Sequence, residues 1–211
     1  MGCLRQPYLF AKDEMNNIVE NGYNKIAKRF DSFRKQFDTR DELLQFASAL
    51  PVGANVLDAG CGTGIPSAKY LATRGFNITC IDSSSKMLEL ARQNVPTANF
   101  SLMDLTSISF RPRAFDGIIA LYSVIHVARE NHSIVFKSFH SVLKPHGLIL
   151  LTAGSSSWEG TDKFLGADMY WSHYGPRKTK SLLTEAGFKI LFGKNVSSRG
   201  ERHHWILAEK S

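Results

Sequence analysis

The amino-acid sequence predicts an α/β fold in which a mostly parallel sheet is covered by helices on both faces. Three observations carry this prediction. Strand-like and helix-like segments alternate between residues 55 and 187, and a glycine-rich turn follows the first strand. At the end of the chain, two strand-like segments follow each other with no helix between them. Strands connected in this way pair antiparallel, so we expect them at one edge of the sheet.

The segment before the first strand reads as helical from residue 11 to residue 50. Apolar residues such as Ile26, Phe30 and Phe33 recur at steps of three and four positions, which is typical of an amphipathic helix. A second helical segment, RDELLQFASAL, ends before Pro51. We expect residues 1–50 to form a helical lid region and residues 51–211 the rest of a single domain, which a length of 211 residues suits.

Periodicity and turn residues set the order of the remaining elements. Strands are expected at 55–57, 76–81, 99–103, the first half of 115–125, 148–152, 188–196 and 203–210, and helices at 65–73, 84–95, 130–143 and 177–187. The sequence KPHG at 144–147 is typical of a turn. The span between 153 and 176 is expected to be irregular. The result is a seven-stranded sheet with an antiparallel last strand.

Composition excludes several classes of protein. With 43% hydrophobic and 21% charged residues, the chain resembles an ordinary soluble domain. It has neither a window of about 18 uninterrupted apolar residues nor the apolar core of a signal peptide, so we expect a cytoplasmic protein without membrane contact. Three cysteines without a CxxC pair favour neither a disulfide framework nor a zinc site. The net charge of +7 comes from scattered bases, which indicates a solvated surface rather than a nucleic-acid partner.

The glycine turn lies in the sequence VLDAGCGTG, with glycines at positions 60, 62 and 64. This spacing matches neither the G-x-G-x-x-G of dinucleotide sites nor the P-loop, which requires a following Lys. Asp58 stands two residues before the first glycine. Its carboxylate would repel a diphosphate but would suit the ammonium group of S-adenosylmethionine (SAM) through a charge-assisted hydrogen bond.

Further segments appear in a fixed order after this turn: ITCIDSSSKML, FSLMDL, FDGIIALYSVIHV and LKPHGLILLT. Together with VLDAGCGTG they resemble the class I SAM-dependent methyltransferases of the small-molecule type, over residues 54–152. The resemblance implies a Rossmann-like, doubly wound sheet and SAM as cofactor, with S-adenosylhomocysteine (SAH) as product. It also implies that Asp82 accepts the ribose hydroxyls, that Asp104 accepts from the adenine amine, and that Met87 and Met103 pack against the adenine.

The N-terminal helices add two lid residues, Tyr23 and Arg34, of which Arg34 suits the SAM carboxylate. The expected cofactor-binding residues are therefore Tyr23, Arg34, Asp58, Gly60, Cys61, Gly62, Asp82, Ser83, Met87, Met103, Asp104, Leu105 and Leu121. Each acid has a structural alternative as a helix cap or turn residue. Met87 has one as a core residue.

Methyl transfer needs a base only when the acceptor arrives protonated. His126, after the fourth strand, is the first candidate, and His173 is the second. Tyr122, Tyr170 and Trp171 are expected to bind the substrate, because aromatic side chains hold flat or cationic groups. A histidine that orders a loop and a packed aromatic insertion are the structural alternatives. His203 and His204 at the start of an expected edge strand are interpreted as structural.

The acceptor is expected to be a small molecule that is methylated on nitrogen, oxygen or sulfur. Residues 120–123 read ALYS, without the prolines of base amino-methyltransferases, and no Cys follows the fourth strand. No carboxylate cluster suggests a metal. A non-catalytic SAM-binding protein and an RNA methyltransferase remain as alternatives, and the sequence does not indicate an oligomeric state.

Overall fold

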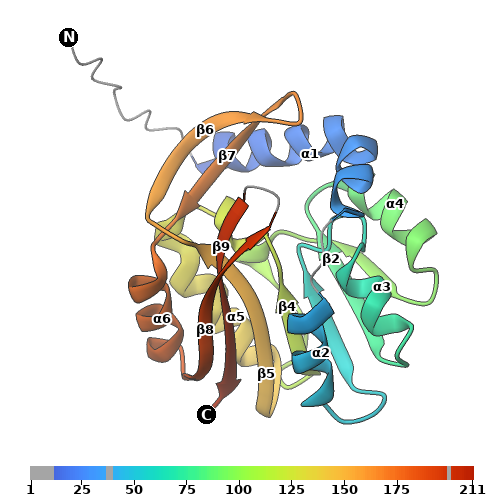
Figure 1. Ribbon diagram of the computed structural model, residues 1–211, viewed down its shortest axis with the longest axis vertical. Helices are drawn as coiled ribbons and strands as arrows, with labels where there is room; N and C mark the ends of the chain where they lie inside the picture. The colour runs from blue at the N-terminus through green and yellow to red at the C-terminus, as the bar shows by residue number, and fades with distance from the viewer. Residues whose placement is uncertain (1–11, 37–39, 199–200) are drawn as a thin grey trace.

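The computed structural model describes residues 12–36, 40–198 and 201–211. Its main feature is a seven-stranded sheet in the order β3-β2-β1-β4-β5-β9-β8 (Figure 1). The strands are β1 (Asn55–Ala59), β2 (Asn77–Asp82), β3 (Asn99–Leu102), β4 (Phe115–Ala120), β5 (Leu143–Gly154), β8 (Phe188–Ser198) and β9 (Glu201–Lys210). The helices are α1 (Lys12–Arg34), α2 (Arg40–Ser48), α3 (Ser67–Ala72), α4 (Ser85–Asn94), α5 (His132–Val142) and α6 (Pro176–Glu185).

The first five strands of the sheet are parallel, and the chain reverses the direction of strand addition between β1 and β4. In sheets of this kind the ligand site lies beyond the carboxyl ends of the strands at that reversal. The last strand, β9, is antiparallel to both β5 and β8, which confirms the predicted antiparallel last strand. The sequence led us to expect His203 and His204 at the start of an edge strand. This was wrong, because β9 lies between β5 and β8 and is an inner strand.

Helices cover both faces of the sheet, as the alternating pattern predicts. On one face, α5 and α6 supply buried residues such as Phe139 and Leu183, which pack with Leu57 of β1. On the other, α2, α3 and α4 supply residues such as Phe46, which pack with Val56 of β1. Neighbouring residues of one strand thus enter opposite cores, since side chains alternate along a strand. This two-sided burial explains the continuous apolar runs of the parallel strands.

The expected turn at 144–147 lies inside the first half of β5. There, His146 has a φ of +61°, and the pairing with β4 jumps from Leu143 to Leu148. The turn residues therefore form an irregularity within the strand instead of preceding it.

The span from 153 to 176 is not irregular, contrary to the sequence prediction. It contains a hairpin of β6 (Trp158–Phe164) and β7 (Ala167–His173). Its two turn residues, Leu165 and Gly166, both have positive φ, which suits a tight hairpin turn. The pattern was not recognisable because most side chains of β6 are exposed, so the strand carries no apolar alternation.

Helix α1 lies together with this hairpin at one end of the sheet (Figure 1). Val19 and Ile26 of α1 form a small core with Ala167 and Met169 of β7. The approach is close enough that a Cβ on Gly22 would lie 2.7 Å from the Asp168 carbonyl oxygen. α2, in contrast, packs into the sheet core through Leu43 and Phe46.

Candidate functional site

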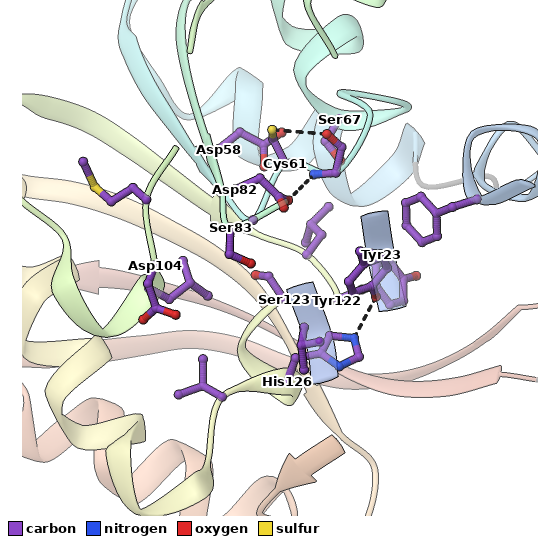
Figure 2. A pocket seen from close by; sticks show the side chains of 18 of the residues that line it. Tyr23, Asp58, Cys61, Ser67, Asp82, Ser83, Asp104, Tyr122, Ser123 and His126 are labelled. Carbon is purple, nitrogen blue, oxygen red and sulfur yellow. Dashed lines mark hydrogen bonds between the residues drawn. The ribbon is translucent and has the colours of Figure 1, made fainter. Parts of the chain in front are cut away.

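A cavity of about 900 Å³ lies beyond the carboxyl ends of β1, β2 and β4, underneath α1 (Figure 2). Most of the residues expected to bind a cofactor line it, together with two of the expected catalytic and substrate residues. These are Tyr23, Arg34, Asp58, Gly60, Cys61, Gly62, Asp82, Ser83, Met103, Asp104, Leu105, Leu121, Tyr122 and His126. We call the part around Asp58, Gly60, Gly62, Asp82 and Ser83 the donor chamber.

The backbone of the glycine turn that follows β1 is hydrogen-bonded to the end of β2. The amides of Gly60 and Cys61 both donate to the carbonyl oxygen of Ile81, at 2.8 and 3.0 Å. Gly60 has a φ of +81°, and a Cβ there would lie 2.3 Å from the Cβ of Ser123. No side chain fits at this position, so the glycine is required by both its backbone conformation and the close approach of the loop after β4.

Asp58 is 2% exposed, and its Oδ2 atom has no hydrogen-bond partner. Burial, followed by the nearby Asp82 carboxylate, raises the pKa of Asp58 to about 8. A buried carboxylate oxygen without a partner is costly, and a cationic group placed beside it would remove that cost. The donor chamber therefore fits a ligand with an ammonium group.

Asp82 is held by two backbone amides. Gly62 N–H donates to Oδ2 at 2.8 Å, and Ser84 N–H donates to Oδ1 at 2.9 Å. Burial raises the pKa of Asp82 to about 6, although these amides act in the opposite direction. A carboxylate has about four acceptor sites, so each oxygen retains a lone pair that can accept a ligand hydroxyl.

Of the residues that were expected to surround an adenine, three line the cavity and one does not. Met103, Asp104 and Leu105 line the cavity, and the Asp104 carboxylate also caps a 3-10 turn by accepting the amide of Thr106 at 2.7 Å. Met87 is fully buried as a core residue of α4 and does not line the cavity. The prediction that Met87 packs against an adenine is therefore not supported, because its side chain turns into the protein.

His126 bridges the lid and the hairpin. Its Nδ1 lies 2.7 Å from the carbonyl oxygen of Tyr170, and its Nε2 lies 2.8 Å from the hydroxyl of Tyr23 (Figure 2). A carbonyl oxygen only accepts, so Nδ1 carries the proton, and the Tyr23 hydroxyl donates to the lone pair on Nε2. Burial lowers the pKa of His126 to about 4, so the ring is neutral at pH 7.

A second cavity of about 400 Å³ adjoins the first. It is lined mainly by rings, and we call it the aromatic chamber: Tyr23, Phe30, Phe33, Tyr122, His126, Phe164, Trp171 and His203, together with Arg34, Ile125 and Glu201. Five residues line both cavities, namely Tyr23, Phe30, Arg34, Tyr122 and His126. The two cavities therefore meet at the Tyr23–His126 pair.

Arg34 is buried and stacks over Tyr122, with its guanidinium carbon 3.9 Å from the ring centre. Both predicted lid residues, and two of the three predicted substrate residues, therefore line these cavities.

Tyr170 and His173 line neither cavity. The Tyr170 hydroxyl donates to Glu159 at 2.6 Å, and His173 Nδ1 lies 2.8 Å from the Ser156 carbonyl oxygen. Tyr170 contributes through its backbone, which fixes the ring of His126.

Sequence reasoning missed several wall residues: Val19, Phe30, Ile65, Ser67, Ser123 and Val127. Two of them carried a readable signal. Val19 and Phe30 lie four positions before and seven positions after Tyr23, so they share its face of α1. Ser123 follows β4 and donates to the Ala59 carbonyl oxygen at 2.7 Å, which only the folded chain reveals.

Within the described part of the chain, no three His, Cys, Asp or Glu side chains gather as a metal site would require. None of the helices described there is long and apolar enough to cross a membrane.

Comparison with known proteins agrees with this geometry. Residues 56–147 match the model of a methyltransferase domain. The malonyl-(acyl-carrier protein) O-methyltransferase of Serratia marcescens is 30% identical over 162 residues, which are 72% of this chain and 62% of that protein. The 2-methyl-6-phytyl-1,4-hydroquinone methyltransferase of Synechocystis is 31% identical over 156 residues, which are 72% of this chain and 47% of that protein. The chain thus spans less than two thirds of the length of these relatives.

Among solved structures, the 1,6-didemethyltoxoflavin-N1-methyltransferase of Burkholderia thailandensis superposes with a TM-score of 0.79. The match covers 98% of this chain and 93% of that one, at 18% identity, and so shows a shared fold. That structure holds 1,6-didemethyltoxoflavin and SAH. The matched domain model and these relatives show a methyltransferase domain at residues 56–147, and the superposition shows that the chain shares the fold of a methyltransferase.

Proposed function

We propose that this protein transfers a methyl group from SAM to a nitrogen, oxygen or sulfur atom of a small-molecule acceptor. The observation that carries the proposal is the buried Asp58 carboxylate beside the glycine turn, whose Oδ2 has no partner within the protein. A ligand ammonium group supplies that partner through a charge-assisted hydrogen bond. The mismatch of the turn with dinucleotide and P-loop spacing supports the same ligand.

The other cofactor contacts follow from the placement of the walls. Asp82 retains lone pairs with which it accepts two ribose hydroxyls, and Asp104, which lines the same cavity, accepts an adenine amine. Met103, Leu105 and Leu121 form the apolar surface along which a flat adenine packs. When bound, SAM supplies an electrophilic methyl group, so the protein's own task is to align the acceptor and to exclude water.

Three residues of the chain are proposed to act on the acceptor side. Tyr23 and Arg34, both on α1, close the cavity from above and keep water out. His126 lies where the two cavities meet, and its Nε2 accepts the Tyr23 hydroxyl, so it can take the proton of a protonated acceptor through that hydroxyl. Its Nδ1–H bond to the Tyr170 carbonyl fixes the ring so that Nε2 faces the Tyr23 hydroxyl.

A small molecule is the acceptor that the geometry favours. Residues of α1 help to line both cavities, whose walls combine apolar and aromatic side chains with a few polar groups, as small-molecule sites usually do. A hydroquinone and 1,6-didemethyltoxoflavin are named for two similar proteins, and both are small molecules. We also propose the cytoplasm as the compartment, because Cys61 and Cys80 are buried free thiols.

Isothermal titration with SAH tests the cofactor site directly. Asp82→Asn keeps the shape of the side chain but removes its charge, and we expect SAH affinity to fall by about 100-fold, since hydrogen bonds to charged groups contribute about 1.5–3 kcal/mol each. Asp162→Asn, an exposed carboxylate on β6, is the matched control and should bind normally. No binding of SAH by the wild-type protein at millimolar concentration would refute the proposal.

A screen of metabolites with SAM, read out as formation of SAH, separates an enzyme from a non-catalytic SAM-binding protein. We expect acceptor-dependent SAH formation. SAH binding that is accompanied by no turnover with any acceptor would favour the non-catalytic alternative.

A further inference from the structure

The aromatic chamber is lined by rings from several parts of the chain. Phe33 of α1 meets Phe164 of β6 edge to face, with ring centres 5.7 Å apart, and Phe164 meets Trp171 of β7 in the same way at 6.1 Å. The rings of Trp171 and His126 lie 5.6 Å apart at an angle of 37°. Walls made of ring faces and edges select a flat partner, because aromatic pairs prefer offset-stacked and edge-to-face contacts.

Polar groups also line the chamber, among them Arg34 and Tyr122. The Tyr23–His126 pair is one polar feature. Another is His203, whose Nε2 lies 3.5 Å from a carboxylate oxygen of Glu201 and whose Nδ1 is buried without a hydrogen-bond partner. Buried polar atoms in proteins are almost always paired. The unpaired nitrogen and the nearby carboxylate therefore favour a ligand that carries polar atoms on its rim as well as an apolar face.

The chemistry of His126 restricts the acceptor further. Its Nδ1–H is committed to the Tyr170 carbonyl, so the ring can take a proton only on Nε2, which accepts the Tyr23 hydroxyl and receives the proton through it. Burial lowers the pKa of His126 to about 4, which makes it a weak base. A weak base removes a proton effectively only from a group that is itself fairly acidic, because general-base catalysis improves as the two pKa values approach each other. Phenols and ring N–H groups meet this condition better than aliphatic alcohols do.

We propose that the acceptor is a planar aromatic or heteroaromatic compound which binds in the aromatic chamber and presents a phenolic O–H or a ring N–H to the Tyr23–His126 pair. This inference rests on the proposed methyltransferase function. The acceptor's proton moves to the hydroxyl oxygen of Tyr23 as the Tyr23 proton moves to Nε2 of His126, and the electron pair left on the acceptor's oxygen or nitrogen forms the new bond to the methyl carbon. The electrons of the broken carbon–sulfur bond stay on sulfur, which leaves neutral SAH, and the proton on His126 passes to water when the site opens.

Three probes of similar size test the inference on the SAH-loaded protein, with binding followed by calorimetry. 2-Naphthol is flat and has a phenolic O–H. Decahydro-2-naphthol has the same carbon skeleton and hydroxyl but is not flat, and 2-methoxynaphthalene is flat but lacks the donor. We expect 2-naphthol to bind at least about tenfold more tightly than decahydro-2-naphthol and several-fold more tightly than 2-methoxynaphthalene. Hydrophobicity alone would favour the saturated compound.

A pair of variants locates the binding. Phe164→Leu removes a ring of the chamber, and we expect it to weaken 2-naphthol binding about three- to tenfold while SAH binding stays unchanged. Phe100→Leu, on β3 and equally half-buried but outside both cavities, should change neither. Normal SAH binding with no preference for 2-naphthol, or with a preference that Phe164→Leu does not reduce, would overturn the inference and leave the proposed function intact. Loss of SAH binding in the wild-type protein would instead refute the proposed function.

Discussion

The donor chamber and the aromatic chamber adjoin each other but are built in different ways. The donor chamber comes from two short segments, the end of β1 with the turn after it and the end of β2 with the residue after it, and these strands are neighbours in the parallel sheet. Its groups are backbone amides, glycines and two carboxylates. The aromatic chamber is assembled from α1, the loop after β4, the β6–β7 hairpin and the start of β9, and its groups are mostly rings.

The difference shows what each part of the molecule is able to specify. A turn between adjacent strands has little freedom, so its geometry is set locally by glycines and by hydrogen bonds to the next strand. A site with such locally determined geometry suits a ligand that stays the same, such as a cofactor. The walls of the aromatic chamber depend on how a helix and a hairpin pack over the sheet. Substitutions there change the shape of the acceptor site without disturbing the cofactor site.

The largest expected effect comes from Gly60→Ala. The new Cβ would lie 2.3 Å from the Ser123 Cβ, at a φ of +81° that disfavours a side chain. We expect a loss of about 2–4 kcal/mol in the free energy of unfolding, measured in urea, and SAH affinity lowered by more than about 100-fold. Gly53→Ala is the matched control, because Gly53 has a φ of +71° but no atom within 4 Å of a new Cβ. Equal effects of the two variants would contradict the steric explanation.

The next effect concerns pH and the donor chamber alone. Burial raises the pKa of Asp58 to about 8, so in the free protein at pH 6–7 its carboxyl is mostly protonated. A ligand ammonium group binds the ionised form, and Asp58 must release its proton on binding. SAH affinity should therefore rise with pH, by up to about tenfold per unit between pH 6 and pH 7.5, and should level off near pH 8.

Calorimetry in buffers of different ionisation enthalpy measures the released proton. Asp58→Asn should bind SAH weakly at every pH and should show no such rise. A wild-type affinity that is independent of pH would mean that the ammonium group does not contact Asp58.

The smallest expected effect is that of Tyr23→Phe, because Tyr23 lies where the two chambers meet. Removing the hydroxyl leaves Nε2 of His126 buried without its donor at 2.8 Å, which costs about 1–2 kcal/mol of unfolding free energy. SAH binding through the donor chamber should change by less than about threefold. Tyr70→Phe on α3 serves as the control and should be close to neutral. A strong loss of SAH binding in Tyr23→Phe would show that the two chambers do not act separately.

Much of the fold was predictable because its signals are local. The glycine spacing, the acid before it and the apolar runs of the parallel strands each follow from a few neighbouring residues, and they placed Asp58, Gly60 and Asp82 correctly around one cavity. The β6–β7 hairpin was not predictable, since the exposed side chains of β6 show no alternation. Met87 was misplaced for a related reason: its position on α4 allowed either face, and packing turned it inward.

By itself, the sequence determined the α/β architecture, the antiparallel last strand and the acidic glycine turn, because strand and turn preferences act over a few residues. Only the tertiary structure decided that β9 lies between β5 and β8, that Tyr170 acts through its carbonyl oxygen, and that Tyr23 donates to His126 across 103 positions of sequence. Such contacts join segments that no local pattern relates. They arise from the packing of α1 and the hairpin over the ends of the strands.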